Sequence, residues 1–338
     1  MRGIKSSILN SVFHTINQLV YRNYYTAKAY YNLLLRAREK EPLIVFQMGK
    51  VGSTTIVNSL KFSGIDMSIY HTHNMTQDWI DRFENASRMH KHIHISEKLH
   101  NLHHLWESRY LLKKMNKGFP KGKKWKVISL VREPVARNVS EFFQYFNVKP
   151  LDSYRYKINY FSRVQARNYT FEINLENEDI EKLFKLFMET VNHDIPLIWF
   201  DSQLKPVFGI DVFSSDFPTS VGYKIYEGEL ADVLILRLEN LNKCSQDAFK
   251  KFLNIDGFTL KKENIASEKP YHAIYREFLN SVTLPESYLE KMYISKYTQH
   301  FYSQEEIKGF RKKWLKNREH ASEEEYIIGS KNTTLTCS

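Results

Sequence analysis

The chain has 338 residues, of which 42% are hydrophobic and 14% are aromatic. This content suffices for a buried core in one large or two modest domains, which excludes an intrinsically disordered protein. The 49 Lys and Arg residues exceed the 38 Asp and Glu residues, and the difference 49 − 38 = 11 favours anionic partners. Nucleotides, acidic glycans, nucleic acid and anionic lipid all fit that charge.

Two cysteines, Cys244 and Cys337, lie far apart and give neither a disulfide framework nor a metal-ligand cluster. No apolar run approaches the ~20 residues that a membrane span requires. Because no signal peptide is recognisable either, we expect a cytoplasmic protein in a reducing compartment.

Residues 1–41 are predicted to form a basic amphipathic helix, because residues 1–38 contain Lys and Arg but no Asp or Glu and their apolar side chains recur near helical spacing. The helix could pack on the protein itself, lie peripherally on an anionic membrane surface, or serve as a transit peptide, although the segment is rich in Tyr rather than Ser. Residues 319–338 are polar and predicted to be disordered.

From Pro42 onward, short apolar strands alternate with helices. The predicted strands are residues 43–48, 67–71, 92–96, 126–131 and 233–238, and the predicted helices are residues 54–62, 80–89, 134–146, 179–191, 272–281, 285–297 and 305–314. This alternation predicts a mostly parallel sheet with crossover helices, in a single α/β domain over residues 42–318. The aromatic-rich residues 154–171 could be a sugar platform or part of the core.

The stretch GKVGSTT, residues 49–55, connects a predicted buried strand to a predicted helix. Such a connection presents unpaired backbone N–H groups and the positive end of the helix dipole, which together attract phosphate. Gly49 and Gly52 allow close backbone approach, and Lys50 adds a mobile positive charge. Because this lysine precedes the second glycine, the nucleoside-triphosphate loop G-x-x-x-x-G-K-[ST] does not match. A plain glycine turn with Ser or Thr capping the helix is the alternative.

The stretch VREPVARNVS, residues 131–140, repeats the strand-to-helix architecture. Arg132 ends the predicted strand, and Pro134 suits the first position of a helix. Ser140 follows two turns into that helix. The guanidinium and the hydroxyl could point to one place beside the first loop, where they would hold a second phosphate.

Together the two motifs resemble the sulfotransferases that use 3′-phosphoadenosine 5′-phosphosulfate (PAPS). In that family a Lys-x-Gly-[Ser/Thr]-[Ser/Thr] loop holds the 5′-phosphosulfate, and an arginine followed eight residues later by a serine binds the 3′-phosphate. Later blocks such as LILRLENL are similar to a bacterial sulfotransferase-like family of capsular polysaccharide synthesis proteins.

The resemblance implies a P-loop-like parallel sheet flanked by helices, with PAPS as the co-substrate and no required metal. The family's C-terminal Arg-Lys-Gly has no counterpart here, so Lys269 and Tyr271 become the candidates on the adenine side. The co-substrate residues expected on this basis are Lys50, Val51, Gly52, Ser53, Thr54, Thr55, Arg132, Ser140 and Lys269.

Transfer of a sulfuryl group to a hydroxyl needs a base, and histidine is the natural one near neutral pH. Two H-x-H pairs, His71 with His73 and His92 with His94, end predicted strands, where open α/β sheets place their ligands. In the sulfotransferases resembled, the catalytic histidine ends the third strand. This implies His94, with His92 beside it and with His73 and Glu97 in reserve. Structural histidines, or a zinc site on the pairs, are the alternatives.

We therefore predict a sulfotransferase acting on a hydroxyl of a glycan or glycolipid, with Lys50 stabilising the leaving phosphate and no nucleic acid as partner. Two other classes stay open. One is a basic membrane-surface or nucleic-acid-binding protein. The other is a kinase-like transferase on the same fold, which would need Mg²⁺ and a carboxylate at a strand end, such as Glu133.

Overall fold

The computed structural model describes residues 41–82, 95–118, 122–151, 155–162, 167–175, 180–261 and 269–315. The chain forms two compact units, and the first covers the described residues of 41–137 and 193–261. The second unit covers the described residues of 138–192 and 269–315. Helix α5 (Pro134–Gln144) begins in the first unit and ends in the second.

The first unit is built on a five-stranded sheet with the order β2-β1-β3-β8-β7. Its strands are β1 (Glu41–Phe46), β2 (Met67–Thr72), β3 (Trp125–Val131), β7 (Tyr223–Glu227) and β8 (Ala231–Arg237). β1 pairs in parallel with β2 and β3, β3 pairs in parallel with β8, and β7 joins as an antiparallel edge strand. The residues 43–46 of β1 are fully buried, as expected for an interior parallel strand.

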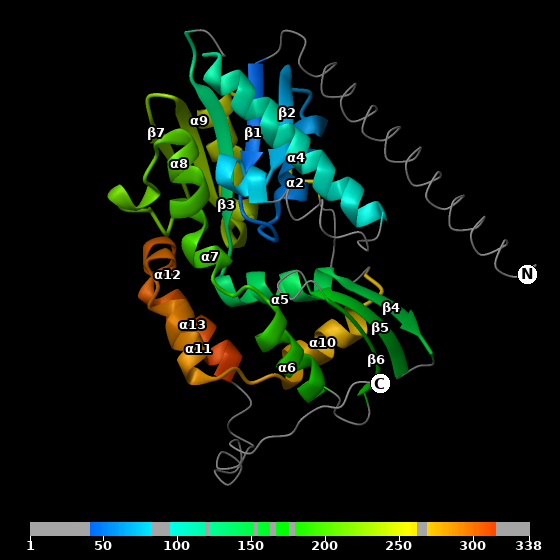
Figure 1. Ribbon diagram of the computed structural model, residues 1–338. Helices are drawn as coiled ribbons and strands as arrows, with labels where there is room; N and C mark the ends of the chain where they lie inside the picture. The colour runs from blue at the N-terminus through cyan, green and yellow to red at the C-terminus, as the bar shows by residue number, and fades with distance from the viewer. Residues whose placement is uncertain are drawn as a thin grey trace, which may run out of the picture. The chain divides into compact units, whose positions relative to one another are not determined.

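Helices flank this sheet. They are α2 (Ser53–Phe62), α4 (Ile95–Asn116), α7 (Ile195–Trp199), α8 (Lys205–Phe208) and α9 (Leu241–Leu253), with the π-helical turn η2 (Phe200–Leu204) and the 3₁₀ turns η3 (Val212–Ser214) and η4 (Leu238–Asn240). In Figure 1, α4 lies across one face of the sheet, over β1 and β2. The described part of the first unit is thus a mixed α/β structure with a largely parallel central sheet.

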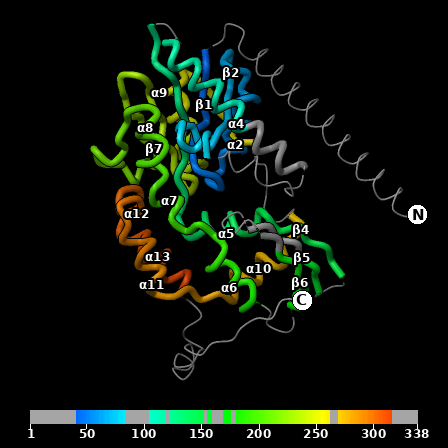
Figure 2. The backbone as a smooth tube through the Cα atoms, in the orientation of Figure 1, coloured from blue at the N-terminus to red at the C-terminus, as the bar shows by residue number. Residues whose placement is uncertain are grey.

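The second unit holds an antiparallel sheet and further helices. Its strands, adjacent in Figure 2, are β4 (Phe146–Pro150), β5 (Arg155–Ser162) and β6 (Arg167–Asn174). Its helices are α6 (Ile180–Thr190), α10 (His272–Ser281), α11 (Glu286–Tyr293), α12 (Lys296–Phe301) and α13 (Gln304–Leu315). Rings of Phe142, Phe187 and Phe278 pack with centroids 5.6–6.1 Å apart, so α5, α6 and α10 share an aromatic core.

Most predicted elements form, with boundaries shifted by a few residues. The prediction of a strand over 92–96 is wrong in its described part, because Ile95 and Ser96 begin the long helix α4. The alternation of histidine and isoleucine over residues 92–95 is too short to distinguish a strand from the start of a helix. The predicted helix 285–297 is two helices, α11 and α12, and Ser295 accepts a hydrogen bond from the N–H of Thr298 to start the second.

The predicted N-terminal helix (residues 1–41) lies outside the described residues except for Glu41, and the predicted tail (319–338) lies wholly outside them. Among the helices that the structure describes, none has both the length and the apolar character needed to cross a membrane.

The connection from β1 to α2 requires a glycine at position 52. Gly52 precedes α2 with φ 90° and ψ 17°, a left-handed conformation that a residue with a Cβ adopts at a cost of ~1–2 kcal/mol. A Cβ at this position would also meet Leu238 Cδ1 at 2.6 Å. The loop therefore packs directly against the residue that follows β8.

We expect Gly52→Ala to destabilise the protein by ~2 kcal/mol or more, because backbone strain and overpacking against Leu238 add together. Gly64→Ala is the matched control, since Gly64 also has a positive φ of 68° but a Cβ there would have no atom within 4 Å of it. The thermal unfolding midpoint of G52A should fall clearly below that of G64A. Equal midpoints would contradict the tight contact with Leu238.

Candidate functional site

The candidate site begins with the loop between β1 and α2. Its chain runs from Gln47 and Met48, both buried, through a turn at Gly49 and Lys50 to Gly52. Lys50 has φ 73°, although it is not a glycine. Non-glycine residues in this conformation are strained and persist where the surrounding structure holds them. The loop therefore has a fixed backbone shape.

Two arginines hold this loop by its carbonyl groups. Arg132 Nη1 donates to the carbonyl oxygen of Lys50 at 3.0 Å, and Arg137 Nε donates to that of Gly49 at 3.0 Å. In a trans peptide the N–H points away from the C=O of the same unit. The N–H groups of Lys50 and Val51 therefore point away from these two contacts, and Arg137, only 3% exposed, is committed to the loop.

The N-termini of α2 and α5 differ in what caps them. α2 has no side-chain cap and no acidic residue in its first turn, which contains Ser53, Thr54 and Thr55. At α5, by contrast, the carboxylate of Glu133 accepts from the N–H groups of Val135 at 2.8 Å and Ala136 at 2.7 Å. Because a carboxylate already fills the positive end of α5, the α2 N-terminus is the end of this pair suited to an external anion.

The support behind both motifs comes from the connection after β8. The backbone N–H of Glu133 donates to Glu239 Oε1 at 2.8 Å, and Leu238 packs against Gly52. Residues from η4 thus fix the loop after β1 and the start of α5 together.

Beside the loop, three histidines cluster at the end of β2. The ring centroids of His71, His73 and His104 lie 4.9–5.5 Å apart. The amide of Gln47 contacts His71 Nε2 at 3.1 Å, and the backbone oxygen of Gln47 contacts His73 Nδ1 at 2.9 Å. A carbonyl oxygen can only accept, so this shorter contact favours a proton on Nδ1 of His73, although the amide Nε2 of Gln47, a donor, also lies 3.4 Å from Nδ1.

His104 belongs to α4 and approaches the cluster from the other side. Its Nδ1 contacts the backbone oxygen of His71 at 2.9 Å. Within the described part of the chain, no group of three or more His, Cys, Asp or Glu side chains is arranged to hold a metal ion. The rings of the cluster instead make contacts to Gln47 and to the backbone oxygen of His71.

The structure brings some predicted residues together and leaves others separate. Lys50 and Arg132 touch through the loop carbonyl, and Val51 to Thr55 follow in the same connection. His92 and His94 lie outside the described residues. Ser140, on α5, and Lys269, just before α10, belong to the second unit, so their part in a site with Arg132 stays a prediction.

Sequence reasoning missed several residues that build this region: Gln47, His104, Trp199 and Gln203. His104 lies in α4, a helix that the sequence analysis did not predict. In this helix the spacing of His104, Glu107 and Ser108 places all three on one face toward β2. No local signal marks Trp199 and Gln203, because their partners are 126 to 128 residues away.

Part of the chain matches a family of known proteins. Residues 170–303 match the model of the NKWYS family, described as "Putative capsular polysaccharide synthesis protein". No curated protein and no solved structure matches the chain. The matched range contains the supporting residues Trp199, Gln203, Leu238 and Glu239, but it contains neither the β1–α2 loop nor Arg132. The match therefore covers residues that support the candidate site, but not the loop itself.

Proposed function

We propose that this protein is a sulfotransferase that moves a sulfuryl group from PAPS to a hydroxyl of a glycan or glycolipid. The match to a capsular polysaccharide synthesis family supports a transferase acting on polysaccharides. The observation that carries the finer proposal is the arginine-held loop: Arg132 fixes the backbone of Lys50 at an α2 N-terminus that has no side-chain cap.

The residues of this loop fit a phosphosulfate group. The N–H groups at the start of α2 and the hydroxyls of Ser53 and Thr54 supply hydrogen-bond donors, and Lys50 supplies the positive charge. The absence of an acidic residue from the first turn of α2 avoids repulsion of an anion. On the 3′ side we assign Arg132 and Ser140, and on the adenine side Lys269.

PAPS, when bound, supplies an activated sulfuryl group whose S–O bond to the 5′-phosphate breaks as a new S–O bond to the acceptor oxygen forms. Lys50 would stabilise the charge that gathers on the departing phosphate. A histidine would take the proton from the acceptor hydroxyl. His94 is the base implied by the resemblance, and His73 is the described candidate, because Gln47 joins it to the loop.

A kinase-like reaction has less support. It needs a carboxylate for Mg²⁺ at the end of a strand, and Glu133 was the candidate for that role. Both carboxylate oxygens of Glu133 accept backbone N–H groups of α5. A metal at Glu133 would compete with this cap.

Binding of the desulfated nucleotide, 3′-phosphoadenosine 5′-phosphate, tests the site. At 100 times its dissociation constant it should stabilise the protein by about 2.7 kcal/mol against thermal unfolding, whereas ATP with Mg²⁺ should stabilise it much less. We expect Lys50→Ala and Arg132→Ala to weaken binding by ~10–100-fold, since each removes a contact to a charged group worth ~1.5–3 kcal/mol.

The matched control is Lys61→Ala, which removes an exposed positive charge from the last turn of the same helix α2. Calorimetric titration should give K61A the affinity of the unaltered protein. If K50A and R132A bind the nucleotide as tightly as K61A, the assignment of this loop is wrong.

The catalytic base is identified by measuring kcat and nucleotide affinity separately in each variant. Replacing the true base by alanine should lower kcat by ~10²–10⁴-fold and leave the affinity for 3′-phosphoadenosine 5′-phosphate unchanged. His73→Ala and His94→Ala are compared in the same transfer assay with a polysaccharide acceptor. Undiminished kcat in both variants would show that neither histidine is the base.

A further inference from the structure

Residues 71–76, at and beyond the end of β2, are held by side chains from two helical segments. From α4, Glu107 Oε2 accepts from the N–H of His71 at 3.3 Å and His104 Nδ1 contacts the oxygen of His71 at 2.9 Å. Ser108 Oγ lies 2.7 Å from Thr72 Oγ1 and donates to the oxygen of Asn74 at 2.7 Å. One side of the segment is thus held by hydrogen bonds from a single face of α4.

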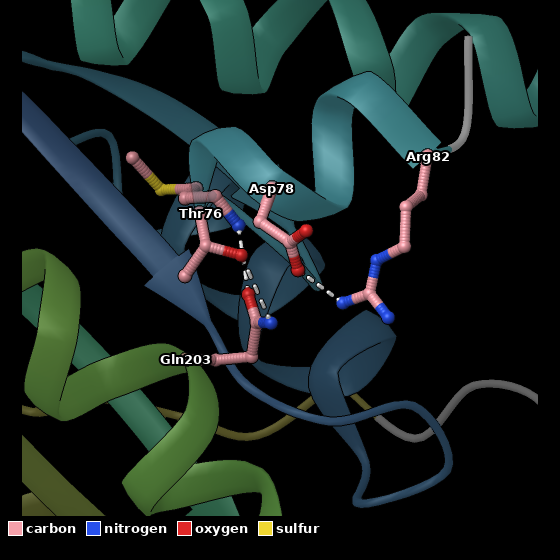
Figure 3. Close-up of polar contacts among 5 residues, drawn as sticks. Thr76, Asp78, Arg82 and Gln203 are labelled. Carbon is pink, nitrogen blue, oxygen red and sulfur yellow. Dashed lines mark hydrogen bonds and ion pairs between the residues drawn. The ribbon is translucent and has the colours of Figure 1, made fainter. Parts of the chain in front are cut away.

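The other side of residues 71–76 is held by hydrogen bonds from α7 and η2. Trp199 Nε1 donates to the carbonyl oxygen of His73 at 2.9 Å. Gln203 Oε1 accepts from the N–H of Met75 at 3.1 Å. Its Nε2 donates to Thr76 Oγ1 at 3.3 Å, and Figure 3 shows the side chains of Gln203 and Thr76 facing each other. Both contacting side chains are nearly buried, with Trp199 3% and Gln203 7% exposed.

A proline explains the unusual shape of this helical segment. Pro206 has no N–H, so it cannot bond to the carbonyl of Ser202 four residues earlier, and the regular α-helical ladder is interrupted. The π-helical turn η2 occupies residues Phe200–Leu204, just before that proline. Such turns are rare and often occur at functional sites.

The segment is anchored next to the candidate loop. The ring of Trp199 packs on Phe46, the last residue of β1, with centroids 4.9 Å apart. The residue after Phe46 is Gln47, whose backbone oxygen contacts His73. Trp199 therefore contacts both the strand that leads into the loop and the backbone of the histidine beside it.

We propose that Trp199 and Gln203 are positioning residues for His73, fixing its backbone so that the imidazole keeps a constant orientation beside the β1–α2 loop. The importance of this orientation for catalysis rests on the proposed function. Every residue from His71 to Thr76 makes at least one hydrogen bond to α4, α7 or η2, which is more than a simple connection requires. Such fixing is how a reactive side chain is kept within the narrow tolerance that catalysis needs.

The test uses the full chain with two variants that replace each side chain by an apolar one of similar or smaller size. Trp199→Phe removes the N–H donor to His73, and Gln203→Met removes both contacts to residues 75 and 76. Gln77→Met is the matched control, because Gln77 Nε2 donates at 2.8 Å to the exposed Asp81 in the same neighbourhood. Three quantities are measured: the ring ¹⁵N resonances of His73, assigned with His73→Gln, the affinity for 3′-phosphoadenosine 5′-phosphate, and kcat.

We expect W199F and Q203M to shift the ring resonances of His73 and to lower kcat by ~10–100-fold, since a displacement of about 1 Å costs up to ~10²-fold. Nucleotide affinity should stay within about twofold of the unaltered protein, and Q77M should change none of the three quantities.

Unchanged His73 resonances in both variants would overturn the positioning role, whether or not transfer is observed. A parallel loss of nucleotide affinity would also overturn it, since the effect would then be general unfolding of the site. If the resonances shift but the unaltered protein transfers no sulfuryl group, the positioning of His73 stands and the proposed function fails.

Discussion

The candidate site depends on one pair of interactions, the hydrogen bonds from Arg132 and Arg137 to the carbonyl oxygens of Lys50 and Gly49. Hydrogen bonds from a charged donor are stronger than neutral ones. They tie the connection after β1 to the connection between β3 and α5, so the N–H groups of the loop and the guanidinium of Arg132 belong to one arrangement. The strained backbone of Lys50 persists because this arrangement holds it.

The two strand–helix connections look alike in sequence, yet their helices differ electrostatically. Glu133 neutralises the N-terminus of α5 internally, and Glu239 in turn holds the backbone of Glu133. α2 has neither a side-chain cap nor an acidic first turn. The positive end of one helix is thus used for stability, whereas that of the other remains suited to an anion.

The histidine cluster and the loop are linked through Gln47, and the family match concerns the elements behind them. Residues 170–303 provide Trp199 and Gln203 for the segment after β2, and Leu238 and Glu239 for the loop and α5. A region outside the candidate loop thus contributes to its geometry, because buried contacts from one part of the chain position side chains on another.

The sequence by itself determined the parallel strands, the glycine-bracketed loop and the arginine that follows β3, because apolar periodicity, glycine and strand ends are local signals. It could not determine which carbonyl oxygens Arg132 and Arg137 would bind, nor that Glu133 would cap its own helix rather than face a ligand. His104, Trp199 and Gln203 reach the end of β2 from positions 33 to 128 residues away, through side-chain contacts that leave no periodic trace. Tertiary packing decided these, because hydrogen-bond partners are chosen by proximity in the fold and not by spacing along the chain.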